Sequence, residues 1–460
     1  MPISREVFEN ASEHEPKFKA PFGLSRETII DISTQKGEPD WMLDKRLRAF
    51  EFFEKAPMPG WGPSLAGLDL KAITYFVRPD TAESKTWAEV PEEIRETFEK
   101  LGIPEAEREA LGGVGAQYDS DMVYHNLKAE LSAKGVIFEN MDVAVREHAE
   151  LVKEYFMTQC VPIHDHKFAM LHAAVWSGGT FIYVPKGVQV DIPLQAYFRM
   201  NTERGGQFEH TLIIADEGSD VHYIEGCSAP KFQAAALHAG CVEIFVKPGA
   251  RVRYSSIENW SKNTFNLNTK RAVVDAGGRI EWLNGNMGSG TTMLYPMSVL
   301  RGRGAKSDYL GIAFAGPLQH QDTGHKLAIV APECAATVLS KSISGGGGRS
   351  TYRGIVKVTA GAERAKVRVQ CDALMLDGAS SSTTIPVMRV ENESASVAHE
   401  ASVGRLGEKE LFYLQCLGLT EQAAVRMLVA GFLEPVVKEL PLEYAVELVK
   451  LIELEMESVG

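Results

Sequence analysis

The sequence predicts a mainly β protein in which a β-helix core lies between helical domains at the two ends of the chain. Between residues 167 and 396, short β-rich runs alternate with turns of Gly, Asp, Asn and Ser. A pattern of strand, turn and strand recurs there. Its turn glycines Gly187, Gly218 and Gly249 are 31 residues apart, and Gly278 follows 29 residues later. Weaker copies turn near Gly304, Cys334 and Gly361.

A repeat of about 30 residues without long helices predicts a solenoid, because one copy cannot bury its own apolar face and must stack on its neighbours. Propeller blades need roughly 40 residues or more, so the period favours a β-helix. The alternative is an ordinary β-sandwich in which the spacing is fortuitous.

The segments on either side of the repeats have helical patterns. Residues 1–166 are predicted to form a mainly helical N-terminal domain, since residues 41–53 carry apolar side chains at three- and four-residue intervals. Residues 397–460 are predicted to form a C-terminal helical domain. There Thr420 fits the N-cap of a helix that ends at Gly431. A final helix begins near Leu442, and its broad apolar surface either packs on the β core or docks a partner.

Composition limits the class of protein. The 460 residues are 45% apolar and 24% charged, which is typical of a soluble globular chain. The net charge of −13 argues against nucleic-acid binding, and no apolar run is long enough to span a membrane. The segment Met1–Glu6 lacks a secretion signal, so we expect a cytoplasmic protein, although a processed organelle protein would look the same.

Motifs for nucleotide binding and hydrolysis do not occur. The P-loop pattern, the GxSxG elbow, HExxH and the Rossmann fingerprint are all missing. The glycine run 345–348 has no lysine in place and is typical of a flexible turn. We therefore expect an assembly scaffold rather than an enzyme, and any ATP that drives it must be held by another chain.

Six cysteines are scattered singly, which argues against a zinc finger or a disulfide framework. Cys227 lies nine residues after Gly218, and Glu258 lies nine after Gly249, so both should occupy one phase on successive coils. Trp260 and Lys270 fall nearby, and Arg199 lies one coil earlier. Positive charge beside a thiol lowers its pKa. The alternative is a buried apolar cysteine.

Cys371 lies on a predicted strand, and His399 and Glu400 follow 28 and 29 residues later, about one coil. Thiolate, imidazole and carboxylate at one place would suit iron or a cluster. The alternative is a buried cysteine and a helix-cap acid. His164-Asp165-His166 on a strand would put two imidazoles on one face, but no third ligand is evident. His320 and His325 are expected to serve turns and packing.

Several segments around these residues resemble the SufB scaffold subunits of the SufB/SufD family, which belong to the SUF iron–sulfur cluster assembly system. The resemblance covers nearly the whole chain. Its most specific segments are Tyr183-Val184-Pro185-Lys186-Gly187-Val188, Pro193 to Asn201, Tyr223 to Pro230, Gln370-Cys371-Asp372 and His399-Glu400-Ala401.

The resemblance implies a right-handed parallel β-helix that works inside a complex. It implies a SufC-type ABC ATPase docked on the C-terminal helices, and either a SufD paralogue or a second copy of this chain. Sulfur would come as persulfide from a cysteine desulfurase or a shuttle protein. A transient iron–sulfur cluster and reduced FAD are the implied cofactors, and no residue can be assigned to the flavin.

The resemblance also assigns roles to residues. Cys227 would receive sulfur, and Cys371 would be the acceptor or cluster ligand, completed by His399 and Glu400 as possible metal ligands. Residues matching the family's sulfur path are Arg199, Asn201, Glu258, Trp260 and Lys270. Two positions depart from relatives: Glu258 stands where they have Gln, and Ala398 stands where some carry an acid.

Two other functions remain open. A structural subunit resembling SufD would need no sulfur acceptor, and Cys371 argues against it. A carbohydrate-active enzyme is suggested by the β-helix alone. Such enzymes are usually exported, and the sequence shows no export signal.

Overall fold

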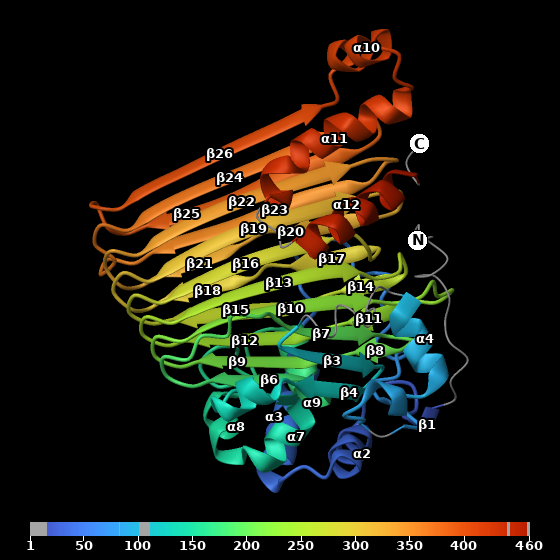
Figure 1. Ribbon diagram of the computed structural model, residues 1–460, viewed down its shortest axis with the longest axis vertical. Coiled ribbons are helices and arrows are strands. Elements are labelled where there is room, and N and C mark those ends of the chain that lie inside the picture. Colours follow the sequence, from blue (N-terminus) through green and yellow to red (C-terminus); the bar gives the residue numbers. More distant parts are fainter. Residues whose placement is uncertain (1–15, 82, 101–110, 439–441, 458–460) are drawn as a thin grey trace.

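The computed structural model describes residues 16–81, 83–100, 111–438 and 442–457. The N-terminal segment Met1–Glu6, used above to predict localisation, lies outside this range. The protein is mainly β, and parallel strands stack into an elongated solenoid with helices at both ends (Figure 1). No helix in the described ranges is long and apolar enough to cross a membrane.

One face of the solenoid is a ten-stranded sheet in the order β26-β24-β22-β19-β16-β13-β10-β7-β3-β4. Every pair from β3 and β7 to β26 is parallel, as stacked coils require. Its strands are β3 (Gly113–Tyr118), β4 (Asp121–Leu127), β7 (Leu194–Arg199), β10 (Asp220–Ser228), β13 (Arg251–Asn259), β16 (Arg279–Asn286), β19 (Lys306–Ala315), β22 (Ala335–Ser344), β24 (Lys366–Met375) and β26 (Ser396–Arg405).

A second, fourteen-stranded sheet forms the other two faces. Two columns of short strands run along the first coils, and the ten-residue strand β23 pairs with the last strand of both columns. The strands are β5 (Ile137–Asn140), β6 (Gly179–Val184), β8 (Gly206–Gln207), β9 (His210–Ala215), β11 (Ala236–His238), β12 (Cys241–Val246), β14 (Thr264–Asn266), β15 (Thr269–Val274), β17 (Thr291–Leu294), β18 (Met297–Leu300), β20 (His320–Thr323), β21 (Lys326–Ile329), β23 (Arg349–Val358) and β25 (Ser381–Val390).

The turns between coils explain the period seen in the sequence. Gly187, Gly218 and Gly249 have positive φ angles of 73°, 68° and 69°, a region that favours glycine. The Gly187 N–H donates to the Glu217 carbonyl on the next coil, and the Gly218 N–H donates to Pro248 in the same way. The fourth turn differs from the prediction, because the left-handed residue is Gly277 and not Gly278.

The N-terminal residues cap the first coil. Besides β1 (Pro16–Lys19) and β2 (Val77–Pro79), they form the helices α2 (Arg26–Lys36), α3 (Asp40–Lys55), α4 (Glu92–Lys100), α6 (Ala129–Ala133), α7 (Met141–Glu147), α8 (Ala149–Tyr155) and α9 (Lys167–Val175), and a short 3-10 helix, η1 (Trp87–Glu89). The helix predicted over residues 41–53 is α3.

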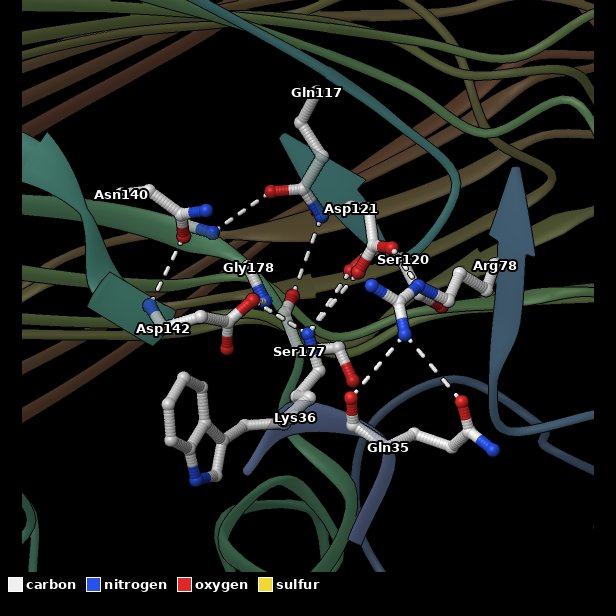
Figure 2. A network of polar contacts seen from close by, with 12 residues as sticks. Gln35, Lys36, Arg78, Gln117, Ser120, Asp121, Asn140, Asp142, Ser177 and Gly178 are labelled. Atoms are coloured by element: carbon white, nitrogen blue, oxygen red, sulfur yellow. Dashed lines mark hydrogen bonds and ion pairs between the residues drawn. The ribbon is translucent and has the colours of Figure 1, made fainter. Parts of the chain in front are cut away.

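A buried ammonium group ties these helices to the sheet. Lys36 at the end of α2 contacts Asp142 at 2.5 Å and Asp121 at 3.3 Å (Figure 2). The Asp142 acceptor is shared, since the Gly178 N–H also donates to Asp142 Oδ2 at 3.2 Å. This network fixes α2 and α7 against the start of the solenoid.

At the other end, α10 (Glu408–Cys416), α11 (Glu421–Val437) and α12 (Leu442–Glu457) follow the last strand. The Thr420 hydroxyl caps α11 by accepting from the Ala423 N–H at 3.2 Å, as predicted. The predicted end at Gly431 is wrong, because α11 continues to Val437. Burial of Leu433 and Val436 against the outer face of the ten-stranded sheet outweighs the modest helix penalty of glycine.

The solenoid is open at the β25–β26 end. In the described chain β26 ends the ten-stranded sheet, and β25 pairs with β23 alone (Figure 1). Apolar side chains are exposed on these strands: Val387, Met388, Val390 and Val403. Long unpaired strand edges with exposed apolar residues are typical of surfaces that pair with another chain.

Candidate functional site

Cys227 lies inside the solenoid on β10, and its side chain is 1% exposed. The register of the sheet places it opposite Glu258 on β13, which confirms the phase predicted from the repeat. The thiol faces a carboxylate of its own strand, since Cys227 Sγ lies 3.9 Å from Glu225 Oε1. Residues two apart on a strand share a face, so both side chains point into the interior.

Lys270 on β15 supplies the positive charge near Cys227. Its ammonium contacts Glu258 Oε1 at 2.6 Å, Ser256 Oγ at 3.0 Å and Glu225 Oε1 at 3.8 Å. Although burial works against charge on this amine, Glu258 and Glu225 keep the pKa of Lys270 above its usual value. Lys270 and Glu258 therefore form an ion pair with no access to water.

A histidine and a tryptophan extend this interior network. His238 Nε2 lies 2.5 Å from Glu209 Oε1, and its other nitrogen lies 2.9 Å from Asn266 Oδ1. The Asn266 amide donates in turn to Glu258 Oε2 at 2.5 Å. Trp260 packs against the imidazole with ring centroids 4.1 Å apart. Cys227, Glu258, Lys270 and Trp260, four of the predicted residues, thus belong to one buried cluster.

The predicted low pKa of Cys227 is wrong for this arrangement. Burial raises the pKa of the Cys227 thiol well above its ordinary value, and the carboxylates Glu225, Glu209 and Glu258 raise it further. Lys270 acts in the opposite direction and is outweighed. The thiol is therefore neutral until a ligand or reactant changes its surroundings.

Arg199 and Asn201 lie apart from this cluster. Arg199 pairs in register with Ser228, one residue beyond Cys227, so its side chain points to the opposite face of the sheet. There Asp119 interacts with both residues. Its negative charge acts on the Arg199 guanidinium, and its carboxylate accepts from the Asn201 backbone N–H at 2.7 Å.

The second predicted site lies on the last two strands of the ten-stranded sheet. Cys371 Sγ on β24 lies 2.9 Å from His399 Nε2 on β26. The imidazole also stacks on Tyr352, with ring centroids 6.4 Å apart and planes at 17°. Cys371 is 4% exposed, and burial, with a smaller contribution from Asp372, raises its pKa to about 12. Burial lowers the pKa of His399, so the pair is a neutral thiol and a neutral imidazole near pH 7.

Glu400 shares the strand but not the face. Its register partner is Gln370, whereas Cys371 pairs with Ala401. The Glu400 carboxylate consequently points outward, where it is 65% exposed and lies 3.7 Å from Arg368. Only its backbone carbonyl approaches the thiol, at 3.6 Å from Cys371 Sγ.

The two cysteines face one interior. Following the register from strand to strand joins Glu225 to Cys371 in a single column of inward positions, and β10 and β24 are five strands apart. At about 4.8 Å per strand, the two sites are about 24 Å apart. The column is Glu225, Ser256, Asn284, Gly311, Ser340 and Cys371.

The neutral state of Cys371 predicts slow alkylation. Iodoacetamide reacts with thiolates, so between pH 7 and 9 the rate at Cys371 should rise about tenfold per pH unit without levelling off. Exposed Cys416 serves as the internal reference and should be modified first. Mass spectrometry of peptides from the folded chain measures both rates. A plateau for Cys371 below pH 9 would contradict the raised pKa.

The other histidine candidates do not form a site. The segment 164–166 precedes α9 and is not a strand; His166 caps α9 by accepting from the Ala169 N–H at 3.4 Å. Asp165 pairs with Arg271, and His164 lies beside Phe52. Because the three residues have separate partners, their ligand atoms do not converge. His320 and His325 lie beside Thr351 and Tyr309, as turn and packing residues would.

Three buried ionisable residues of the cluster around Cys227 were not anticipated: Glu209, Glu225 and His238. Glu225 could have been found, because it lies two residues before Cys227 and so shares its face. Glu209 and His238 are 29 residues apart, about one coil. They lie before the strands on which the repeat is clearest, so the repeat did not identify them.

Fold and site together define a parallel β-solenoid protein that keeps one thiol in a charged interior and another beside an imidazole at its open end. Two models of protein families match parts of this chain. Residues 198–432 match the description "SUF system FeS cluster assembly, SufBD core domain", and residues 116–196 match "SufBD protein N-terminal region".

Curated relatives agree over almost the full length. The chain is 53% identical to an iron–sulfur cluster assembly SufBD family protein of Staphylococcus epidermidis, over 96% of this chain and 95% of the relative. Family proteins of Staphylococcus haemolyticus and Staphylococcus aureus are 53% and 52% identical with the same coverage. The chain belongs to the SufBD family of iron–sulfur cluster assembly proteins.

Proposed function

We propose that this chain is the SufB-type scaffold of a cytoplasmic SUF complex. It accepts persulfide sulfur at Cys227 and passes it to Cys371, where a transient cluster is built with His399, Glu400 and a partner subunit. Membership in an assembly family favours this role over a carbohydrate-active enzyme, and a cysteine with an imidazole beside it favours it over a structural subunit resembling SufD.

The contact between Cys371 and His399 carries the proposal. A thiol sulfur and an imidazole nitrogen 2.9 Å apart are two ligands of types that bind iron and iron–sulfur clusters. They lie on the last two strands of the ten-stranded sheet, at the open end, where a partner can supply the remaining ligands. The Glu400 carboxylate lies on the outer face of the same strand, so its proposed role is toward that partner.

Sulfur transfer to Cys227 is a thiol–persulfide exchange. The Cys227 sulfur attacks the outer sulfur of the donor persulfide, the S–S bond of the donor breaks, a new S–S bond forms at Cys227, and the Cys227 proton leaves with the donor thiol. The proposed donor is a cysteine desulfurase or its shuttle protein. Conversion of the transferred sulfur to sulfide takes two electrons, and reduced FAD in the complex is the proposed source.

The path from Cys227 to Cys371 is supported by the inward column between them. Small and polar residues fill the intermediate positions: Ser256, Asn284, Gly311 and Ser340. Glu258, Trp260 and Lys270 lie at its start. Arg199 and Asn201 would act from the other face of β7, by holding the strand end beside Cys227.

Two surfaces suit the proposed partners. The exposed edges of β25 and β26 suit a SufD paralogue or a second copy of this chain. The C-terminal helices suit the SufC-type ABC ATPase, because α11 and α12 enclose an apolar groove of about 200 Å³ lined by Val429, Leu433, Val437, Val449 and Ile452. Exposed apolar residues also lie on α10, on α11 and in the turn between them: Phe412, Tyr413, Leu417 and Met427.

Anaerobic reconstitution tests the proposal. The complex purified with its partners, given ferrous iron, a persulfide donor and reduced FAD, should develop the absorption band of thiolate-bound iron. Acid-labile sulfide should appear in step with the band. A complex that takes up neither iron nor sulfide under these conditions would refute the scaffold function.

A further inference from the structure

A thiol and two carboxylates converge inside the solenoid, far from Cys371. One ligand atom each from Glu209, Glu225 and Cys227 lie within 4.8 Å of one another. The three residues are 3%, 1% and 1% exposed. Glu225 and Cys227 come from β10, and Glu209 comes from the turn before β9. The three side chains are therefore held by a strand of one sheet of the solenoid and by the turn before a strand of the other.

One carboxylate oxygen of this group has no partner. Glu209 Oε1 accepts from His238, but Glu209 Oε2 is buried without a hydrogen bond among the described residues. A buried carboxylate oxygen without a partner is costly and therefore rare. Gly240 makes room for this arrangement, because a Cβ there would lie 2.4 Å from Glu209 Oε1. The missing side chain at Gly240 thus makes room for the Glu209 carboxylate, whose Oε1 bonds His238 while Oε2 has no partner among the described residues.

Carboxyl groups outnumber basic groups around these ligands. Three carboxyl groups, Glu209, Glu225 and Glu258, face two basic groups, Lys270 and His238, and burial raises the pKa of Glu225. Lys270 is committed to Glu258 at 2.6 Å and stands 3.8 Å from Glu225. A divalent cation would compensate the charges of a Glu225 carboxylate and a Cys227 thiolate, which a low-dielectric site otherwise disfavours.

We propose that Glu209, Glu225 and Cys227 bind a divalent transition-metal ion. One sulfur and two carboxylate oxygens suit Fe²⁺, Co²⁺ or Zn²⁺ better than Mg²⁺ or Ca²⁺, which prefer oxygen alone. On binding, the S–H bond of Cys227 breaks, the sulfur–metal bond forms and one proton leaves. The metal keeps its oxidation state. The ion thereby produces the thiolate that the metal-free fold suppresses.

A cavity beside Trp260 lies near this site. About 350 Å³ of space lies between the solenoid and α12, and its lining includes Trp260, Lys262 and Leu451. Trp260 also packs on His238, which bonds Glu209, so side-chain contacts link the wall of the cavity to one proposed ligand.

The inference that the natural ion is ferrous iron rests on the proposed function. The inference that a metal ion binds here does not. If iron binds beside the cysteine that receives sulfur, both components of a cluster share one compartment before they reach the open end. The position on β10, five strands from Cys371, makes this a second site and not part of the first.

Cobalt binding tests the site without the Cys371 ligands. In a Cys371→Ala background, Co²⁺ added anaerobically should give a thiolate-to-cobalt absorption band with one ion per chain. The further change Cys227→Ser should remove the band. Glu209→Gln and Glu225→Gln, which keep the side-chain shape, should each weaken binding about tenfold or more. Cys334→Ser, which removes another buried thiol, should change nothing.

Two outcomes would overturn the proposal. One is the absence of a band in the Cys371→Ala background. The other is a band that survives Cys227→Ser but is lost with Cys241→Ser, which would place the ion at His172, His210 and Cys241, the other buried ligand cluster of the described chain. Far-UV circular dichroism checks that each variant is folded. Cluster reconstitution by the unmodified complex is measured separately, so failure of the scaffold function and failure of this site are distinguishable.

Discussion

Replacing Cys371 by Ala is expected to abolish cluster formation in the assembled complex while the solenoid stays folded. The thiol is the one sulfur ligand beside His399 among the described residues, and its loss leaves an imidazole that cannot hold a cluster alone. Iron and acid-labile sulfide per complex should fall about tenfold or more. The loss of stability should be small, because Cys371 lies at the end of the solenoid, where few coils pack beyond it.

The matched control for this result is Cys334→Ala. Cys334 is also a buried, unpaired cysteine at the margin of the same sheet, but its thiol contacts backbone carbonyls and no imidazole. This variant should assemble clusters at the normal yield. Normal yield from Cys371→Ala would instead remove Cys371 from the site, whatever the control shows.

Two further variants distinguish the contributions of His399 and Glu400 to the site around Cys371. His399→Ala should lower cluster yield nearly as much as Cys371→Ala, because it removes the second interior ligand. Glu400→Gln changes a carboxylate on the outer face, 3.7 Å from Arg368. It should act only in the complex with the partner subunit, and have no effect on metal binding by the chain alone.

The repeat could be predicted from the sequence because its turns impose a backbone conformation that few residues tolerate. Positive φ at one position of each turn selects glycine at Gly187, Gly218 and Gly249. Later turns place Glu333 and Arg364 in the same conformation, and there the sequence signal fades. Stacking on neighbouring coils stabilises these turns without glycine, so they cannot be recognised from residue type alone.

The site could be predicted only as far as the phase of the repeat allowed. Cys227 and Glu258 are 31 residues apart and pair in register, whereas Glu258 and Asn286 pair at a spacing of 28. The coil length thus varies, and a difference of one residue moves a side chain to the other face of a strand. Between Cys371 and Ala401 the offset is 30, so His399 faces the thiol and Glu400 does not.

Lys270→Met is expected to destabilise the chain by about 3–5 kcal/mol, because it leaves Glu258 buried without its cation. The ammonium of Lys270 is 0% exposed and bonds Glu258 at 2.6 Å. Urea unfolding at pH 7 measures the loss. Lys186→Met is the surface control: Lys186 pairs with Glu217 at 2.7 Å, but both are largely exposed, so its loss should change the free energy of unfolding far less.

Removing both charges tests the cause of this loss. In Lys270→Met with Glu258→Gln, no charge of the pair remains buried, and the carbonyl oxygen of the new side-chain amide can still accept from Asn266, so much of the stability should return. Acidification should narrow the gap between the native chain and Lys270→Met. Although burial opposes it, Lys270 holds the pKa of Glu258 below its usual value, and stability gained that way is present above the unfolded pKa and lost as pH falls through the folded one. A double variant as unstable as Lys270→Met alone would mean that packing, not charge, accounts for the loss.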